Sequence, residues 1–339
     1  MAADGSKKSV IAAIAGNSVI CVAKVIGFLM TGSGAMLSEA IHTGADLMNQ
    51  WLLFFGIIRS TKKADPLFPF GYARERFVWA LISAVGIFFL GCGVTIYHGI
   101  HSLMDPSHEI SDPSWAIGVL VFSFVLEGIV LWVAAKELLT QSRATGMPFG
   151  QYCREAADPS AVAVLLEDAA ACFGVLIALL SLGLTMWTGQ TYWDGIGSIA
   201  IGVLLGFVAI WLIQRNRMLL VGQAIPQSAQ DSIAEILTAH PAVERVEGMK
   251  TRLVDANTYN VNLSIDFDGR ALVPELQPKL KEAYPRIKEG DYELFEAFAG
   301  DLAEDVVDRM AEKVQEMEAS IRQAVPQASQ VDIEPSGGE

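Results

Sequence analysis

Charged residues and cysteines are both scarce in this sequence. Of its 339 residues only 18% are charged, whereas 52% are hydrophobic and the mean hydropathy is +0.38. A soluble protein of this length carries more charge, so the composition argues against that class and indicates a chain that resides in a bilayer. The four cysteines, which are Cys21, Cys92, Cys153 and Cys172, form no C-x-x-C pair. Their scatter predicts neither a zinc knuckle nor a disulfide framework.

The charge that is present lies mainly in the C-terminal third. Residues 221–339 include 23 acidic and 11 basic side chains, so they carry a net −12 of the chain's −14. We therefore predict a transmembrane domain over residues 1–220 and an acidic cytoplasmic domain over residues 221–339. An acidic surface repels the phosphates of nucleic acid, so no nucleic-acid partner is expected. It either attracts cations or only keeps the domain soluble.

Six apolar stretches are long enough to cross a bilayer, whose core of ~30 Å needs about 20 helical residues. They are Val10–Met30, Met36–Arg59, Phe77–Leu103, Ser114–Leu138, Ser160–Trp187 and Gly195–Ile213. The first follows Lys7 and Lys8, as a cleavable signal would, but it is long and five more stretches follow it. We expect it to be a membrane anchor, and the whole to be a polytopic α-helical membrane protein.

Basic residues predict the orientation of these spans. They precede the first span, occupy alternate connecting segments and follow the last span, at Lys7, Lys8, Arg59, Lys62, Lys63, Arg74, Arg76, Lys136, Arg143, Arg154, Arg215 and Arg217. The segments Met104–Pro113 and Thr188–Tyr192 contain no Lys or Arg. The positive-inside rule then places both termini in the cytoplasm. We expect the protein to lie in the plasma (inner) membrane.

The C-terminal third has the pattern of a small α+β domain. Gln227–Ala239 predicts a helix, Val243–Val254 and Tyr259–Phe267 predict two strands, and Leu302–Val325 predicts a second helix with one buried stripe. Val331–Ile333 offers a last short strand. The segment Ala271–Gly300 suggests further helix, but its three prolines prevent a firm placement.

Ionisable residues within two of the spans are the candidates for chemistry, because such residues are costly inside a bilayer. Glu39, His42 and Asp46 are spaced three and four apart, which puts them on one face of a helix. The fifth span carries Glu167 and Asp168 and no basic residue. Imidazole and carboxylate donors suit zinc, which takes four ligands in a tetrahedron. His42 and Asp46, with a carboxylate of the fifth span, could supply three of these ligands.

Packing roles are the alternative explanation for each of these residues taken alone. Lys24, in the first span, either extends to the interface or pairs with Glu39. Glu127, in the fourth span, either belongs to a proton path or pairs with a neighbour. A polar cluster of this size on two helices is nevertheless more typical of a binding site than of packing.

Several motifs resemble the cation diffusion facilitator family, within it the branch of vertebrate zinc transporter nine. They are Gly32–Asp46 with its H-x-x-x-D, Asn17 and Lys24, Phe70–Arg76, Val85–Phe88, Tyr97–Gly99, Val164–Asp168, Asp194–Ser198 and Val331–Pro335. The resemblance covers nearly the whole chain. It implies six transmembrane helices, a ferredoxin-like cytoplasmic domain, a homodimer, and efflux of zinc or a related metal in exchange for protons.

The sequence also departs from the family pattern. The family's acidic ligand on the fifth helix falls on Asp168, so the resemblance implies His42, Asp46 and Asp168 as metal ligands. Val164 stands where a further ligand one turn before Asp168 is usual, so the fourth ligand is open. Glu167 and Glu39 are candidates, either as ligands or as groups that support the ligands. Phe68 replaces a loop histidine, and His240 is the single histidine of residues 221–339. These changes predict no loop metal site and no regulatory zinc cluster. His98 and His101, with His108, Asp105, Glu109 and Asp112 in the next loop, either collect metal or serve as anchors and a solvated loop.

The predicted function is a secondary active transporter for a divalent metal, zinc first, working by alternating access with proton antiport. Its partners would be the metal ion, protons, the lipid bilayer and a second copy of the chain, and no cofactor is expected. The alternatives are efflux of manganese, cobalt, iron or cadmium, or a membrane scaffold or metal sensor that transports nothing. An enzyme is not predicted, because the sequence has no H-E-x-x-H or G-x-S-x-G motif.

Overall fold

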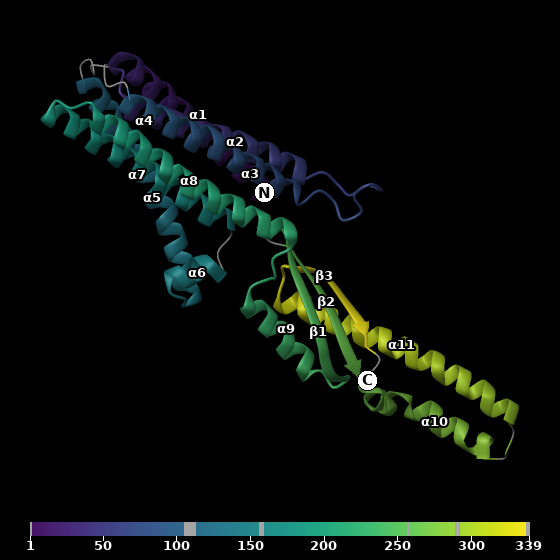
Figure 1. The fold of residues 1–339 in the computed structure, drawn as a ribbon. Coiled ribbons are helices and arrows are strands. Elements are labelled where there is room, and N and C mark those ends of the chain that lie inside the picture. The colour runs from purple at the N-terminus through teal and green to yellow at the C-terminus, as the bar shows by residue number, and fades with distance from the viewer. Residues whose placement is uncertain are drawn as a thin grey trace. The chain divides into compact units, whose positions relative to one another are not determined.

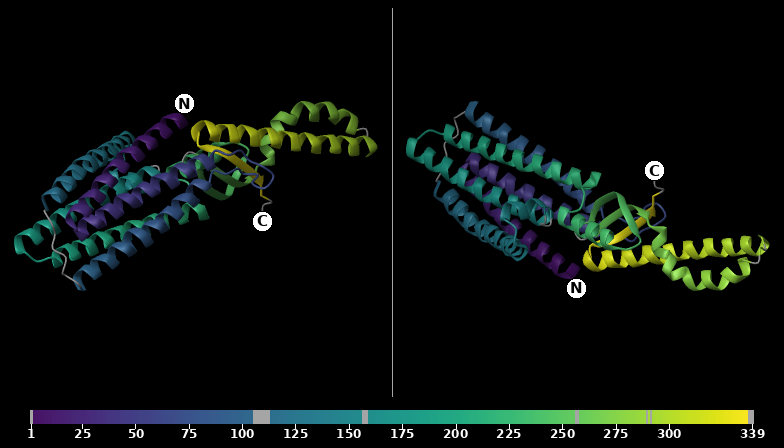
Figure 2. Two further views of the ribbon diagram at one scale, coloured as in Figure 1. Left: turned by 90° about the horizontal axis from the view of Figure 1, so that it is seen from above. Right: turned by 90° about the horizontal axis from the view of Figure 1, so that it is seen from below.

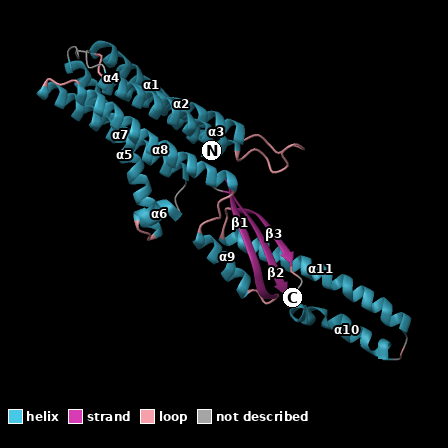
Figure 3. Ribbon diagram, in the orientation of Figure 1, coloured by secondary structure: helices cyan, strands magenta, loops and turns pink. Residues whose placement is uncertain are grey.

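The computed structural model describes residues 2–104, 113–155, 159–255, 258–288, 290 and 292–336. The chain divides into two compact units, Met1–Val221 and Gly222–Glu339. The first is almost entirely helical, and the second combines helices with a sheet (Figure 1; Figure 3).

Helices that run alongside one another build the first unit (Figure 2). They are α1 (Ala2–Thr31), α2 (Gly34–Ser60), α3 (Glu75–Gly86), a π-helical segment (Ile87–Val94), α4 (Thr95–Met104), α5 (Pro113–Thr145), α6 (Phe149–Glu155), α7 (Pro159–Thr188) and α8 (Tyr192–Val221). Each predicted span lies within a helix, the third within the continuous run from α3 to α4. The short helix α6 was not predicted from the sequence.

Five helices of the described chain are long and apolar enough to cross a membrane. They contain Ile14–Thr31, Glu75–Met104, Trp115–Thr145, Val164–Thr188 and Tyr192–Val221. Helix α2 has 27 residues but is less apolar, because Glu39, His42 and Asp46 interrupt its sequence. It packs against α1, α3, α7 and α8, so its polar residues are enclosed by the apolar helices. The unit is therefore the membrane part of a polytopic helical protein.

Small residues allow the helices of this unit to approach closely. Gly99 of α4 and Gly195 of α8 face each other, and a Cβ atom at Gly99 would lie 2.9 Å from the Gly195 carbonyl oxygen. Met36 at the start of α2 is fully buried in a cluster with Val175 of α7 and Ile201 of α8. These contacts fix the first turns of α2 against α7 and α8, which also carry residues of the polar region.

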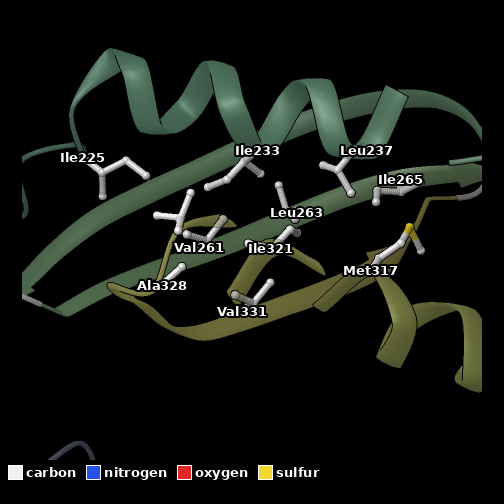
Figure 4. Close-up of a cluster of buried hydrophobic side chains, with 11 residues drawn as sticks. Ile225, Ile233, Leu237, Val261, Leu263, Ile265, Met317, Ile321, Ala328 and Val331 are labelled. Atoms are coloured by element: carbon white, nitrogen blue, oxygen red, sulfur yellow. The ribbon is translucent and has the colours of Figure 1, made fainter. Parts of the chain in front are cut away.

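The second unit is an α+β domain of the predicted ferredoxin-like type, with three strands. Its elements are α9 (Gln227–Ala239), β1 (Val243–Asp255), β2 (Thr258–Phe267), α10 (Val273–Lys288), α11 (Tyr292–Ala324) and β3 (Ala328–Pro335). The sheet order is β1-β2-β3, with β1 antiparallel and β3 parallel to β2. Alternate residues Val261, Leu263 and Ile265 of β2 are buried against α9 and α11 (Figure 4).

The predicted elements of this domain are present, but several differ in length, and β3 spans Ala328–Pro335 where Val331–Ile333 was predicted. Helix α11 begins at Tyr292, ten residues before the predicted Leu302, and α10 accounts for much of the segment that the sequence did not place. Pro278 and Pro285 lie inside α10. Ion pairs join the two helices, since Lys279 pairs with Asp305 and Glu275 with Lys313.

Candidate metal-binding site

The N-terminus of α2 is bound by a carboxylate from α8. Asp194 accepts hydrogen bonds from the Ser33 hydroxyl at 2.6 Å, from the Ala35 amide at 3.1 Å and from the Gly34 amide. Ser33 is also the N-cap residue, and its hydroxyl accepts a hydrogen bond from the Met36 amide at 3.3 Å. A carboxylate at this end of a helix satisfies free amides and interacts favourably with the helix dipole. The start of α2, and so the direction of its polar face, is thereby fixed.

Glu39, His42 and Asp46 lie on one face of α2, as predicted. His42 is at the centre, with Nε2 3.4 Å from Asp46 Oδ2 and Nδ1 3.9 Å from Glu39 Oε1. The side chains of Glu39 and His42 are 0% and 3% exposed, whereas that of Asp46 is 20% exposed. Two ligands of a tetrahedral zinc site, each about 2.1 Å from the metal, are themselves about 3.4 Å apart. The spacing of His42 Nε2 and Asp46 Oδ2 therefore fits two ligands of one zinc ion.

Helix α7 adds two carboxylates that differ in their contacts. Glu167 is held by Asn49 of α2, whose side-chain amide donates to both carboxylate oxygens at 2.9 Å. Asp168 Oδ2 is buried and has no hydrogen-bond partner in the described part of the chain. Asp46 of α2 lies close enough to interact electrostatically with both residues. The structure thus joins Glu167 directly to α2 and leaves an oxygen of Asp168 free beside Asp46.

The predicted ligands do not form a finished coordination sphere. Among the described residues, no group of three His, Cys, Asp or Glu side chains lies close enough to hold a metal ion. His42 and Asp46 are in place, but Asp168 is near them without completing the set.

Lys24 of α1 is the cation of this region. It is 1% exposed and donates to Glu39 Oε2, Thr43 Oγ1 and Glu127 Oε1, each at 2.9 Å. Of the two roles considered from the sequence, pairing with Glu39 is confirmed, and Glu127 is a second partner. A buried lysine in a membrane span requires such carboxylates, because the desolvated charge is otherwise very costly.

Gly174 of α7 leaves room for this arrangement. A Cβ atom at this position would collide with Glu39 Oε1 and lie 3.3 Å from His42 Nδ1. Sequence reasoning missed both Gly174 and Asn49. Asn49 continues the spacing of Glu39, His42 and Asp46 by three further residues, so the same helical periodicity would have found it. No sequence pattern marked Gly174.

The remaining candidates lie elsewhere. Val164 is 42% exposed and Phe68 is 47% exposed, and neither side chain can ligate a metal. The His98 ring lies close to the start of α2, since a Cβ atom at Gly34 would be 3.0 Å from it. His101 packs against Tyr97. Asp105, His108, Glu109 and Asp112 lie outside the described residues.

His240 follows α9 in the second unit. Its Nδ1 accepts a hydrogen bond from the Ala242 amide at 3.3 Å, and its Nε2 lies 3.7 Å from Glu316 Oε2. Lys313 and His240 lower the pKa of Glu316, with the hydrogen bond from Lys313 as the largest cause. These contacts are those of a residue that ends a helix and pairs at the surface.

Apolar helices that enclose a buried histidine, several carboxylates and one lysine define a polytopic membrane protein with an internal polar site. Comparison with known proteins identifies its family. A model of the cation efflux transmembrane domain matches residues 10–221. The chain belongs to the cation efflux family, which is the cation diffusion facilitator family that its motifs resemble.

Known relatives extend this match to the second unit. The chain is 36% identical over 333 residues to the human protein named proton-coupled zinc antiporter SLC30A9, mitochondrial, covering 97% of this chain and 58% of the relative. It is 34% identical over 337 residues to metal tolerance protein C4 of Arabidopsis thaliana, covering 97% and 73%. It is 24% identical over 250 residues to the cation-efflux pump FieF of Salmonella paratyphi A, covering 72% and 76%. The chain therefore spans little more than half the length of the human relative.

Proposed function

We propose that the protein is a secondary active transporter that exports a divalent metal, zinc first, in exchange for protons. The observation that carries this proposal is the pair of donors inside the bundle, His42 Nε2 and Asp46 Oδ2, 3.4 Å apart. A nitrogen and an oxygen at that distance suit zinc. The names of the relatives, a zinc antiporter, a metal tolerance protein and a cation-efflux pump, support the same class of transporter.

His42, Asp46 and Asp168 are the proposed metal ligands. The free oxygen of Asp168 supports its role, because a buried carboxylate oxygen without a partner is costly unless something binds it. Glu167 is engaged by Asn49 on both oxygens, which favours a supporting role and leaves water as the fourth ligand. Glu127 is the proposed member of a proton path, since its Oε2 is also buried without a hydrogen bond in the described part.

Alternating access is the proposed transport cycle. With His42 neutral and the carboxylates ionised, the site takes the metal from one side of the membrane, and α7 closes on α2 as Asp168 joins the ligands. A change in the packing of the helices then opens the site to the other side, where protons displace the metal. Metal and proton transport are linked because the same lone pairs bind both.

The proposal includes the domain organisation, the dimer, the orientation and the membrane of the transporter. Residues 1–220 form the transport domain in the lipid bilayer, residues 221–339 form a cytoplasmic domain, and two chains form a dimer. Both termini are cytoplasmic, as the distribution of Lys and Arg supports. We assign the protein to the plasma (inner) membrane, whereas the name of the human relative places that protein in mitochondria.

Uptake into sealed proteoliposomes tests the function. With an acidic lumen and zinc outside, we expect zinc to accumulate and the lumen to become less acidic, and His42→Ala to abolish both signals. Zinc that binds to the purified protein without entering the vesicles would instead support the scaffold or sensor. Manganese, cobalt, iron and cadmium, offered under the same gradient, would establish the selectivity.

A further inference from the structure

Glu39 lies between the ammonium group of Lys24 and the imidazole of His42. One carboxylate oxygen, Oε2, accepts a hydrogen bond from Lys24 at 2.9 Å, and the other, Oε1, is 3.9 Å from His42 Nδ1. All three side chains are at most 3% exposed. Glu39 is therefore anchored on one side by a cation, and its second oxygen is directed toward the imidazole.

The facing atoms of Glu39 and His42 have no other hydrogen bonds. Glu39 Oε1 and His42 Nδ1 are both buried, and neither has a hydrogen-bond partner within the described ranges. At 3.9 Å they are about 1 Å beyond hydrogen-bond distance. A small rotation of the imidazole would satisfy both atoms at once. Gly174 keeps this space open, because a Cβ atom there would meet the same two atoms.

The other ring nitrogen of His42 faces the proposed metal. Nε2 is 3.4 Å from Oδ2 of Asp46, the second proposed ligand on α2. Histidines that bind a metal through one nitrogen usually donate the N–H of the other to a carboxylate or carbonyl, which fixes the tautomer and makes the ring a better donor. Glu39 Oε1 is placed to be that acceptor.

We propose that Glu39 orients His42 for metal binding without binding the metal itself, and that Lys24 is the positioning residue that holds Glu39 in place. This inference rests on the proposed function, because it assumes that His42 ligates the transported metal. Thr43 and Glu127 complete the arrangement by binding the remaining N–H groups of Lys24. With its Oε2 bound to Lys24, Glu39 is kept out of the coordination sphere.

A simpler role for Lys24 would be to neutralise nearby carboxylates. The two roles differ in what happens when Lys24 and Glu127 are removed together. Lys24→Met with Glu127→Gln removes one positive and one negative charge, so the net charge of the region stays the same while Glu39 loses its anchor. Charge neutralisation predicts little change in metal affinity, whereas positioning predicts a loss.

A cycle of variants in the full-length protein measures the dependence. Zinc affinity is determined by equilibrium dialysis of the purified protein in detergent, for the wild type, Glu39→Gln, Lys24→Met/Glu127→Gln, and all three changes combined. Removal of a group that orients a metal ligand costs about 10- to 100-fold in affinity. We expect losses of about that size in Glu39→Gln and in the charge-balanced double variant. The triple variant should stay within about threefold of Glu39→Gln, because effects that act through one contact do not add.

The opposite results would overturn the inference. Wild-type affinity in either Glu39→Gln or the charge-balanced variant would show that His42 needs no such support. Losses that multiply in the triple variant would show that Lys24 acts independently of Glu39. If the charge-balanced variant does not fold, as judged by size-exclusion profile and circular dichroism, Glu39→Gln, which leaves Lys24 paired with Glu127, still decides whether Glu39 supports His42. His42→Ala is the separate control. Wild-type zinc affinity in His42→Ala would refute the proposed site. A loss of affinity in His42→Ala, together with losses that multiply in the triple variant, would refute only this inference.

Discussion

Asn49 of α2 donates its side-chain amide to both carboxylate oxygens of Glu167 of α7, at 2.9 Å each. This contact joins the two helices that carry the proposed ligands. It also distinguishes Glu167 from the adjacent Asp168. Glu167 is bound by the Asn49 amide, whereas an oxygen of Asp168 has no hydrogen-bond partner among the described residues. Adjacent residues of a helix point about 100° apart, so this difference follows from the helix itself.

Glu167→Gln tests the supporting role of Glu167. The amide keeps the size of the side chain and an oxygen for Asn49, so we expect measurable zinc transport with altered pH dependence, because the amide does not titrate. Zinc affinity should fall by less than about tenfold, which is the lower end of the range for groups outside the coordination sphere. Asp168→Asn is the matched variant. An equal loss of zinc binding in the two would show that Glu167 is itself a ligand.

Alanine at His42, Asp46 or Asp168 should remove a ligand. We expect zinc affinity to fall by more than about 100-fold in each variant, since even groups that only orient a ligand cost 10- to 100-fold. Flux should disappear, while the size-exclusion profile and helical content remain those of the wild type. Retained flux in Asp46→Ala would refute the assignment of the site.

Gly174→Ala tests the space beside His42. The added methyl group would collide with Glu39 Oε1, so the carboxylate must move away from His42. We expect zinc affinity to fall by about tenfold, as for other changes that disturb the support of a ligand. Gly183→Ala on the same helix is the matched control, because a Cβ atom there has no atom within 4 Å. Equal zinc affinities in the two variants would show that the space is not needed.

His240→Ala should leave transport nearly unchanged. A single imidazole without thiolate or histidine partners binds zinc weakly, and the contacts of His240 to Ala242 and Glu316 are structural. We expect zinc flux within about twofold of the wild type, because surface substitutions of this kind have small effects. Calorimetric titration that shows a tight site lost with His240 would contradict this prediction.

Helical periodicity predicted the parts of the site that lie on one helix. Glu39, His42 and Asp46 share a face because residues three and four apart do so on any regular helix. The contacts between helices could not be predicted in this way, because spacing along one helix does not say which residue of another helix meets it. The bond between Asn49 and Glu167, the second partner of Lys24 and the space at Gly174 are all of this kind.

A similar limit applied to the second unit. The stripe on α11 predicted part of the core, and its residues Met317 and Ile321 are fully buried there. Helix α10 was obscured by Pro278 and Pro285, which normally interrupt a helix interior. Its ion pairs with α11 help to hold it, and such pairs depend on tertiary structure.

The carboxylate of Asp194 should matter for stability rather than for metal binding. It accepts three hydrogen bonds from Ser33, Gly34 and Ala35 at the start of α2. A hydrogen bond to a charged group contributes about 1.5–3 kcal/mol to the free energy of unfolding. Asp194→Asn keeps the shape but removes the charge and one acceptor, so we expect the thermal unfolding midpoint in detergent to fall on the order of 5 °C. Zinc affinity of the folded protein should change less than about threefold, because the Asp194 carboxylate binds Ser33, Gly34 and Ala35 and, within the described residues, shares no hydrogen-bond partner with the proposed ligands. Ser198→Ala is the matched control, since it removes one buried hydroxyl that donates to the Asp194 backbone oxygen at 3.1 Å and leaves the carboxylate intact. If Asp194→Asn unfolds at the wild-type temperature, the contact between α8 and the start of α2 does not stabilise the bundle. A loss of zinc affinity like that of His42→Ala would instead place Asp194 in the transport site.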